Sequence, residues 1–315
     1  MERDTNPPLL SIVIVSYNVK DFLTECIQSV YDFIPPPFEI IVVDNASSDD
    51  TCFVVKSRFP DALLLENKDN KGFSEANNQG FRISQGQYLL LLNPDARLID
   101  AGVKVGTDFL SNQENSNLIL GAKIQNPDGT FQASAWKFPN LLRLLLESIF
   151  LNRFFDPATY RKLNLYTDPT QVDFLSGAGL LMRSKKFDDL DGFDENLFWM
   201  DDADLCYRNS ISGGENFYFP SWHIMHHIGG SSKNNLNKVI ANQIISKMKF
   251  YRKHHNKAAY LLCAAFSLNQ ILIRIIILAF SSLIIPKHKI KRDAYLFSFR
   301  AWRKFIKHPD QPGTV

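Results

Sequence analysis

Three carboxylates stand close together in the segment GFDENLFWMDDADLC, at Asp201, Asp202 and Asp204. Aspartates at the start of a helix cap free N–H groups and complement the helix dipole, each contributing about 0.3–1 kcal/mol. Carboxylates this close also repel one another, and such clusters are typical of sites that bind a cation or use a carboxylate as a general base. The cluster therefore predicts a catalytic or cation-binding site as well as the first turn of a helix.

Another carboxylate, Asp95, follows an apolar run in LLLLNPDARL. Carboxylate oxygens suit Mg²⁺ or Mn²⁺, and such a cation can bridge two phosphates and take up charge as a diphosphate leaves. Asn93 can add an oxygen contact but no charge. Since Asn-Pro-Asp is also a good turn sequence, the motif alone supports a cation site and a plain turn equally.

Three histidines, His223, His226 and His227, lie in the strand-like segment SWHIMHHIGGSS. A neutral imidazole is a good ligand for a divalent ion, although a lone histidine is more often structural. His226 follows Asp202 by 24 positions, which is enough for a helix, a turn and a return strand. The spacing therefore predicts that both reach one crevice.

These groups need a scaffold, and the N-terminal third of the chain alternates strand-like and helix-like segments. Nearly continuous apolar runs predict strands covered on both faces, and the segments between them have helical apolar spacing. The alternation predicts an α/β fold with an open, mainly parallel sheet. The expected strands are residues 9–18, 38–47, 61–67 and 86–95, and the expected helices are residues 20–33, 48–59 and 73–84.

Polar residues follow every expected strand of this sheet. In open α/β sheets, ligands bind beyond the carboxyl ends of the strands. Turn and cap preferences explain any one of these ends, but four such ends together predict a polar ligand site. Because neither GxGxxG nor GxxxxGK[ST] occurs, a dinucleotide oxidoreductase and a P-loop phosphotransferase lose their main support. The residues concerned are Ser16, Asn18, Asp44, Asn70, Asn93 and Asp95.

The motifs in their order along the chain resemble glycosyltransferase family 2, in its rhamnosyltransferase-like and galactofuranosyltransferase-like branch. The resemblance covers roughly residues 9–232 and implies a GT-A fold, a divalent cation (Mg²⁺ or Mn²⁺) and a single inverting displacement. It implies transfer of a sugar, rhamnose-like by preference, from a nucleotide-diphosphate donor to a glycan or polyprenyl-diphosphate-linked acceptor in cell-surface polysaccharide synthesis. The motifs are SIVIVSYN, IIVVDNASSDDT, NKGFSEANNQG, LLLLNPDARL, NPDGTFQ, FLSGAGLLMRS, GFDENLFWMDDADLC and HHIGGSS.

The resemblance also assigns the donor site. Asp44 resembles the acid that contacts the base or ribose of the donor nucleotide. The residues expected around the same pocket are Ser16, Asn18, Asn70 and Asn77.

For the metal and the base, the resemblance assigns Asp95 to the last position of the DxD-type metal motif. The first position is Asn93, a departure that weakens the expected metal affinity. Asp202 resembles the catalytic base, the second acid of an ED or DD pair whose first acid is Asp201. His226 resembles the histidine that contacts the metal or diphosphate, with the adjacent His227 as the alternative.

The formal net charge of +2 hides a division of the chain. Residues 247–308 contain 14 Lys and Arg and one acid, whereas the remainder has 21 basic and 32 acidic residues. An acidic body is a poor nucleic-acid binder, and a basic tail with a long apolar stretch suits an anionic membrane surface. We therefore expect a catalytic domain over residues 1–247 and a membrane-associated helical tail over residues 248–315. The four cysteines show no metal-ligand spacing, and MERDTNPPLL does not resemble a secretory signal.

The tail contains an apolar stretch at residues 258–286 that exceeds the ~20 residues needed to span a bilayer. Arg274 near its centre would cost about 2.5–3.5 kcal/mol in the bilayer. The favoured interpretation is a monotopic or re-entrant helix pair on the cytoplasmic face of the cell membrane, with a single span and a buried helix as alternatives. The following residues, 292–309, alternate basic and aromatic side chains as a surface-lying, partner-binding or oligomerisation helix would.

Two other functions compete with sugar transfer. A non-catalytic membrane adaptor is supported only by Asn93 and by the absence of a glutamate at Asp201, and the remaining motif acids and His226 argue against it. A sugar-nucleotide pyrophosphorylase would need a Gly-rich basic loop after the first strand, which SYNVKDFL does not supply.

Overall fold

The computed structural model describes residues 9–151, 163–227 and 236–309. The chain forms two compact units. The first, here called the α/β unit, comprises Met1–Lys137, Tyr160–Glu195 and Asp202–Ser231. The second, the helical unit, comprises Phe138–Thr159, Asn196–Asp201 and Ser232–Val315.

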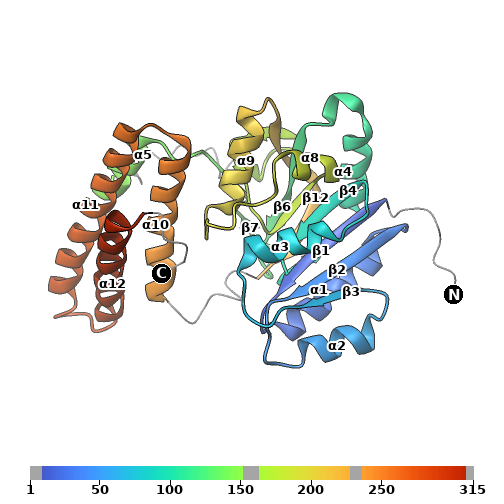
Figure 1. The fold of residues 1–315 in the computed structure, drawn as a ribbon, viewed down its shortest axis with the longest axis horizontal. Coiled ribbons are helices and arrows are strands. Elements are labelled where there is room, and N and C mark those ends of the chain that lie inside the picture. The colour runs from blue at the N-terminus through green and yellow to red at the C-terminus, as the bar shows by residue number, and fades with distance from the viewer. Residues whose placement is uncertain (1–8, 152–162, 228–235, 310–315) are drawn as a thin grey trace. The chain divides into compact units, whose positions relative to one another are not determined.

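The N-terminal part of the α/β unit contains all seven expected elements. Its strands are β1 (Leu10–Ser16), β2 (Phe38–Asp44), β3 (Leu63–Glu66) and β4 (Tyr88–Leu92), which lie parallel in the order β3-β2-β1-β4. The connecting helices are α1 (Lys20–Phe33), α2 (Thr51–Arg58) and α3 (Phe73–Arg82) (Figure 1). Since all these strands run the same way, the residues that follow them meet at one edge of the sheet.

The sheet continues beyond β4 with a change of direction. Strand β11 (Gly179–Arg183) lies antiparallel between β4 and β6 (Leu118–Gln125), and β12 (Glu215–His226) runs parallel to β6. The short β5 (Ala96–Leu98) pairs with the end of β12 and β7 (Phe131–Gln132) with the end of β6. Further described elements of this unit are β8 (Ala135–Trp136), β9 (Thr170–Val172), β10 (Phe174–Leu175), α4 (Gly102–Ser111), the short 3-10 helix η1 (Gln113–Asn115), α8 (Ser184–Asp189) and α9 (Asp201–Ile211), whose first residue is grouped with the helical unit.

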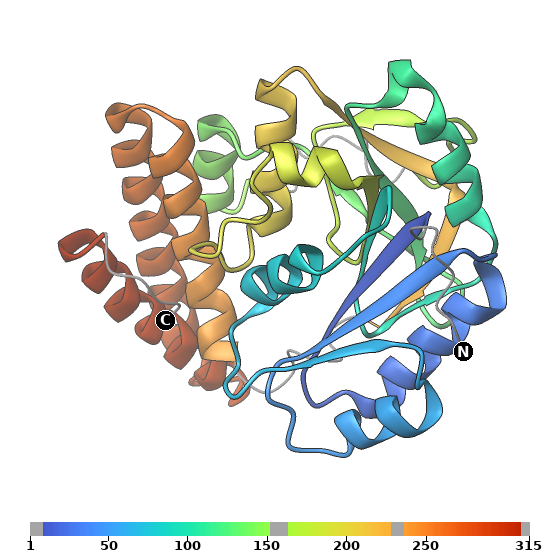
Figure 2. The same ribbon diagram turned by 45° about the vertical axis from the view of Figure 1, so that its right-hand side comes forward.

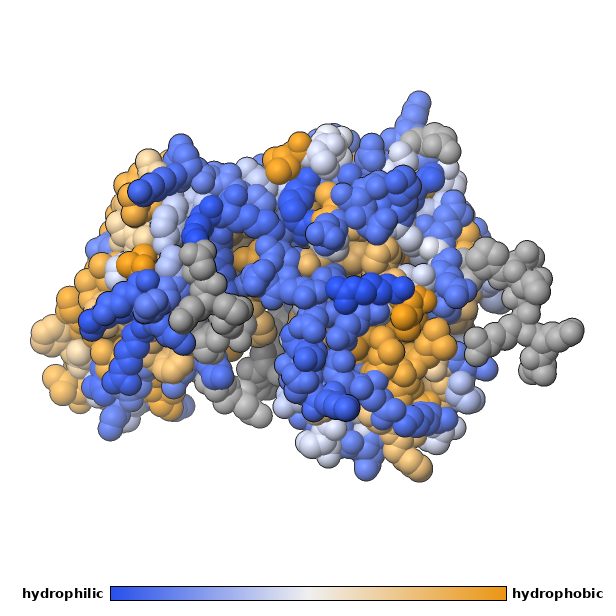
Figure 3. Space-filling model, in the orientation of Figure 1, coloured by the Kyte–Doolittle hydropathy of each residue, from blue (hydrophilic) through white to orange (hydrophobic). Residues whose placement is uncertain are grey.

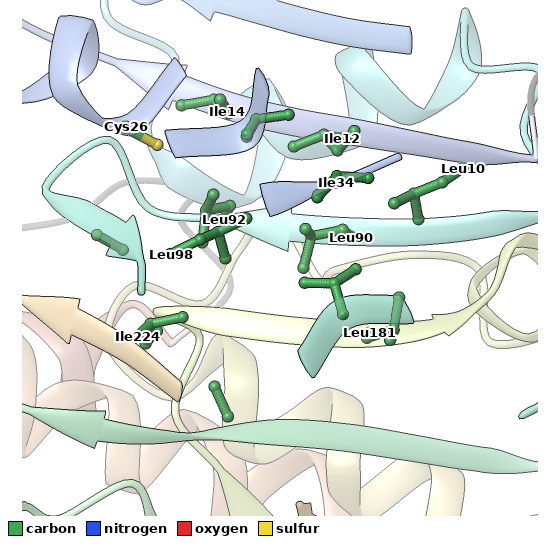
Figure 4. Close-up of a cluster of buried hydrophobic side chains, with 14 of the residues drawn as sticks. Leu10, Ile12, Ile14, Cys26, Ile34, Leu90, Leu92, Leu98, Leu181 and Ile224 are labelled. Atoms are coloured by element: carbon green, nitrogen blue, oxygen red, sulfur yellow. The ribbon is translucent and has the colours of Figure 1, made fainter. Parts of the chain in front are cut away.

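Helices cover both faces of the parallel strands (Figure 2). Successive side chains of a strand point to opposite faces, so Ile12 and Ile14 join one buried cluster with α1, while Val13 points to α3. Helix α3 lies close to the sheet because Gly80 has no side chain, and a Cβ there would meet Val13 Cγ1 at 2.5 Å. The α1-side cluster extends through Leu90, Leu181 and Ile224 (Figure 4), so one core supports every strand that ends at the predicted site.

The helical unit contains α5 (Leu141–Ser148), α10 (Leu236–His254), α11 (Lys257–Ser281) and α12 (His288–Lys307). The bounds of this unit differ from the expected boundary between catalytic domain and tail at residue 247, because α5 and α10, which precede or cross that residue, pack on α11 and α12. Composition revealed the apolar, basic tail but not the earlier segments that share its buried face.

Helix α11 continues without a break through Arg274. The Arg274 guanidinium donates to the Glu147 carbonyl oxygen at 3.3 Å and lies 4.4 Å above the Phe150 ring. Lys247 forms an ion pair with the Glu147 carboxylate at 2.8 Å, and although burial opposes ionisation, these cations lower the pKa of Glu147. The positive charge of Arg274, in the middle of the apolar stretch, therefore has stabilising contacts inside the helical unit.

Helix α11 is long and apolar enough to cross a membrane by length and composition, with a mean hydropathy of 2.1 in its most apolar window, and only 22% of that window is buried. Large apolar side chains are exposed around the turn between α11 and α12, where Figure 3 shows orange atoms gathered at the lower left. They include Phe280, Leu283, Ile284, Ile285 and Ile290.

Candidate active site

The strand ends of the α/β unit are joined to one another by backbone hydrogen bonds. The N–H of Asn45, just after β2, donates to the carbonyl of Ser16 at the end of β1 at 2.8 Å. The N–H of Asn67, after β3, donates to the carbonyl of Asp44 at 2.9 Å. The residues leaving β1, β2 and β3 are thus held in one row, at the edge of the sheet where the sequence predicts a ligand site.

Two predicted donor-site residues have unsatisfied polar atoms in this row. Asp44 is 2% exposed and its Oδ2 accepts from the N–H of Ser47 at 2.9 Å. Asp44 Oδ1 and Ser16 Oγ are buried and have no hydrogen-bond partner among the described residues. Burying a polar atom without a partner costs about 1–3 kcal/mol, so these atoms are suited to meet donors from a bound ligand.

Burial, followed by the charges of Asp44 and Glu66, raises the pKa of the neighbouring Cys52 thiol to about 12. The thiol therefore stays protonated and is no nucleophile.

The three predicted asparagines hold the loops around this row. Asn18, at a φ of 54°, accepts from the N–H of Ser48 at 2.7 Å. Asn70 Oδ1 accepts from the N–H of Gly72 at 2.9 Å, and Asn77 Nδ2 donates to the carbonyl of Phe73 inside α3 at 2.9 Å. One polar atom of each asparagine is thus engaged in shaping the loops, whereas the buried Ser16 Oγ and Asp44 Oδ1 have no such partner among the described residues.

The structure brings together the two predicted metal ligands. His226 Nε2 lies 3.2 Å from Asp95 Oδ1, and these side chains are 13% and 4% exposed. The contact follows from strand pairing, because β5 begins directly after Asp95 and places Ala96 opposite His226.

The other two histidines have structural contacts. The His223 ring nitrogen Nδ1 hydrogen-bonds with the Asp100 carboxylate, which also accepts from the His223 backbone N–H. The His227 ring packs 4.7 Å from the Phe22 ring, and the backbone N–H of His227 donates to the Asp95 carbonyl at 3.0 Å. Of the two adjacent candidates, His226 is the one whose imidazole reaches Asp95.

No group of three or more His, Cys, Asp or Glu side chains comes together among the described residues to form a metal site. Asp95 and His226 alone offer two ligand atoms, so a cation held there would need phosphate oxygens or water as further ligands. A further contact comes from Gln132, whose Nε2 lies 3.1 Å from His226 Nδ1. Sequence reasoning missed Gln132, although it ends the quoted motif NPDGTFQ.

Asp202 is connected to the Asn93–Asp95 turn through the dipeptide Gly177-Ala178. Asp202 Oδ2 accepts from the N–H of Gly177 at 3.1 Å, and Asp202 Oδ1 accepts from the backbone N–H of Ala203 at 2.7 Å. The carbonyl of Ala178, the residue after Gly177, accepts from the N–H of Asn93 at 3.1 Å. The half-buried Asp202 carboxylate is therefore linked to the Asn93–Asp95 turn through one dipeptide.

The other two acids of the cluster differ from Asp202. Asp201 is nearly buried at the first position of α9. Asp204 is fully buried, and its Oδ2 accepts from Arg208 Nε at 2.7 Å. The same guanidinium also donates to the carbonyls of Leu190 and Gly192, so the Asp204 and Arg208 pair joins α9 to the loop at residues 190–192. Asp204, predicted with the catalytic residues, thus has structural contacts, for which its i,i+4 spacing to Arg208 was a signal in the sequence.

The family model described as glycosyl transferase family 2 matches residues 11–191, which include every strand end described above except His226. The chain belongs to glycosyl transferase family 2.

Among family 2 relatives, the chain is 29% identical over 237 residues to the N-acetylglucosaminyl-diphospho-decaprenol L-rhamnosyltransferase of Mycobacterium tuberculosis, covering 70% of this chain and 76% of that protein. It is 23% identical over 253 residues to the rhamnosyltransferase WbbL of Escherichia coli K12, covering 77% of this chain and 92% of that one. These similarities place this family 2 glycosyltransferase in the rhamnosyltransferase-like branch.

A solved structure of the mannosyltransferase PcManGT from Pyrobaculum calidifontis, in complex with GDP-Man and Mn²⁺, matches the fold. The TM-score is 0.58 at 13% identity, with 98% of this chain and 89% of that chain covered. The likeness confirms the GT-A fold expected for the family 2 enzyme.

The Asp204 contacts predict that Asp204→Asn destabilises the enzyme by about 1–3 kcal/mol, because the half-buried Arg208 guanidinium loses the carboxylate charge that faces it at the fully buried position 204. Asp202→Asn is the matched control and should cost less, since an amide oxygen can still accept from the two backbone N–H groups. Urea denaturation of the full chain measures both. A stable Asp204→Asn protein that binds donor but has lost transfer would return Asp204 to the catalytic residues.

Proposed function

We propose that this family 2 enzyme transfers a sugar, with rhamnose favoured, from a nucleotide-diphosphate donor to a hydroxyl of a glycan or polyprenyl-diphosphate-linked acceptor. The observation that carries the proposal is the link from Asp202 through Gly177 and Ala178 to the Asn93–Asp95 turn. It gives one carboxylate for the acceptor and another for the diphosphate. The choice of substrates is supported by the relatives' names, which describe rhamnosyl transfer and, in one case, a polyprenyl-diphosphate-linked sugar.

In the proposed reaction, the acceptor oxygen bonds to the anomeric carbon as the bond to the diphosphate oxygen breaks on the opposite face. The Asp202 carboxylate takes up the acceptor's proton. Its negative charge also stabilises the oxocarbenium character of the transition state. A single displacement of this kind inverts the anomeric configuration.

Asp95 and His226 are the residues suited to hold Mg²⁺ or Mn²⁺ at the diphosphate. Their oxygen and nitrogen, 3.2 Å apart, fit two ligands of one small cation. When bound, the cation would neutralise the leaving diphosphate. With one protein charge in the pair, the affinity should depend on the donor's phosphates.

A first test identifies the donor. Thermal shift against a panel of nucleotide sugars with Mg²⁺ or Mn²⁺, followed by a donor-hydrolysis assay, should show stabilisation and turnover with the same compound. Binding with no turnover towards any donor or acceptor would favour the non-catalytic adaptor.

The metal assignment predicts that excess EDTA abolishes transfer and that Asp95→Asn weakens donor binding and transfer together, because the diphosphate loses its cation. Titration calorimetry with the donor and a transfer assay measure the two effects, with added Mn²⁺ restoring the EDTA-treated wild type. Full turnover in EDTA would reject the metal site.

The base assignment predicts a different result for Asp202→Asn. The amide keeps the size and capping ability of the side chain but cannot take up a proton, so donor binding should survive while transfer falls by about 10²–10⁴-fold. The same calorimetry and assay apply. Near-normal transfer by the folded variant would make Asp201 the next candidate.

We further propose that the turn between α11 and α12 holds the enzyme on the cytoplasmic face of the membrane. Phe280, Leu283 and Ile284 are 71%, 83% and 84% exposed, and the next segment carries Lys287 and Lys289. Apolar side chains beside basic ones suit insertion into the interface of an anionic bilayer.

Replacement of Phe280, Leu283 and Ile284 by serine should therefore weaken sedimentation with phosphatidylserine vesicles by at least about tenfold, because apolar burial is lost. High salt should release the wild type only in part, since screening leaves that burial intact. Phe53→Ser is the control, because Phe53 is equally exposed, at 71%, on α2 of the other unit. Unchanged sedimentation of the triple variant would contradict this membrane contact.

A further inference from the structure

Gln132 lies behind the proposed metal ligand His226. Strand β7 places it opposite Ile124 of β6, and its side chain is half-buried. Its Nε2 is 3.1 Å from His226 Nδ1, while its Oε1 is buried without a hydrogen-bond partner among the described residues. Among the described residues, the Gln132 amide therefore hydrogen-bonds to the imidazole through its nitrogen and has no partner at its oxygen.

This orientation fixes the imidazole proton. An amide NH₂ can only donate, so His226 Nδ1 must accept and the ring proton must sit on Nε2. That N–H then points to Asp95 Oδ1, 3.2 Å away. In this tautomer Nε2 has no lone pair free for a cation, so the arrangement is the one suited to the metal-free site.

Rotating the amide by half a turn gives the opposite tautomer. Gln132 Oε1 then accepts from Nδ1–H, and the ring proton has moved from Nε2 to Nδ1 with no change of net charge. The Nε2 lone pair now faces the Asp95 carboxylate oxygen, and these two electron-rich atoms repel unless a cation lies between them. The oxygen end of the amide has no hydrogen-bond partner among the described residues, so the rotation breaks no hydrogen bond there.

We propose that Gln132 is a positioning residue that sets the tautomer of His226, as hydrogen-bond donor to Nδ1 without metal and as acceptor when a divalent cation joins Asp95 and His226. The inference rests on the metal site of the proposed function. Outer hydrogen bonds of this kind orient ligating histidines and change metal affinity by about 10–100-fold.

The test compares Gln132→Glu, which can only accept, with Gln132→Met, which has similar length and does neither. Long-range ¹H–¹⁵N NMR of the metal-free full-length protein in alkaline buffer reports the His226 tautomer. We expect Nε2–H in the wild type and Nδ1–H in Gln132→Glu. Gln171→Glu, which adds the same charge at an exposed position on β9, should keep Nε2–H.

Mn²⁺ affinity, measured by electron paramagnetic resonance of free Mn²⁺ with a nucleoside diphosphate present, gives the second readout. Gln132→Met should bind Mn²⁺ about 10–100-fold more weakly than the wild type, and Gln132→Glu at least as tightly. Nε2–H in Gln132→Glu, or wild-type Mn²⁺ affinity in Gln132→Met, would overturn the inference. If no form binds Mn²⁺, wild type included, the metal site is rejected, and the metal-free tautomers still decide whether Gln132 sets the proton position.

Discussion

The antiparallel placement of β11 beside β4 is the constraint on which the rest of the site depends. Gly179, the first residue of β11, pairs with Leu92, the last residue of β4, so the chain enters β11 where the neighbouring strand leaves the sheet. The dipeptide before Gly179 must therefore lie against the Asn93–Asp95 turn. The Gly177 N–H donates to Asp202 and the Ala178 carbonyl accepts from Asn93, which links Asp202 to the turn that carries Asp95.

Buried polar groups in the α/β unit fall into two kinds with different consequences. Asp204 and Arg208 form an ion pair, and Arg208 also donates to two carbonyls of the loop at residues 190–192. These contacts stabilise the packing of α9 on that loop. Ser16 Oγ and Asp44 Oδ1 are buried without such contacts among the described residues. A ligand can satisfy such atoms, so Ser16 and Asp44, which follow adjacent strands, are the ones that fit the proposed donor site.

The sequence predicted what local patterns encode. Strands β1 to β4 are continuous apolar runs and α1 to α3 have helical spacing, so all seven were predictable. Motif order led to Asp95 and His226 as a pair. Contacts between distant segments were not predictable. The register of β5 on β12 decides which of His226 and His227 faces Asp95, and the packing of α5 on α11 decides which groups surround Arg274. Gln132 was missed because its contact depends on the pairing of β7 with β6.

The contacts of Arg274 also bear on how the helical unit meets a membrane. A helix that spans the bilayer alone would carry this guanidinium into the hydrocarbon region without the Glu147 carbonyl or the Phe150 ring, at a cost of about 2.5–3.5 kcal/mol. A helix that stays packed on α5 keeps both contacts and still presents the apolar turn after Ser281. Burial of that turn in the membrane interface is therefore compatible with the folded helical unit, whereas a lone span requires α11 to leave it.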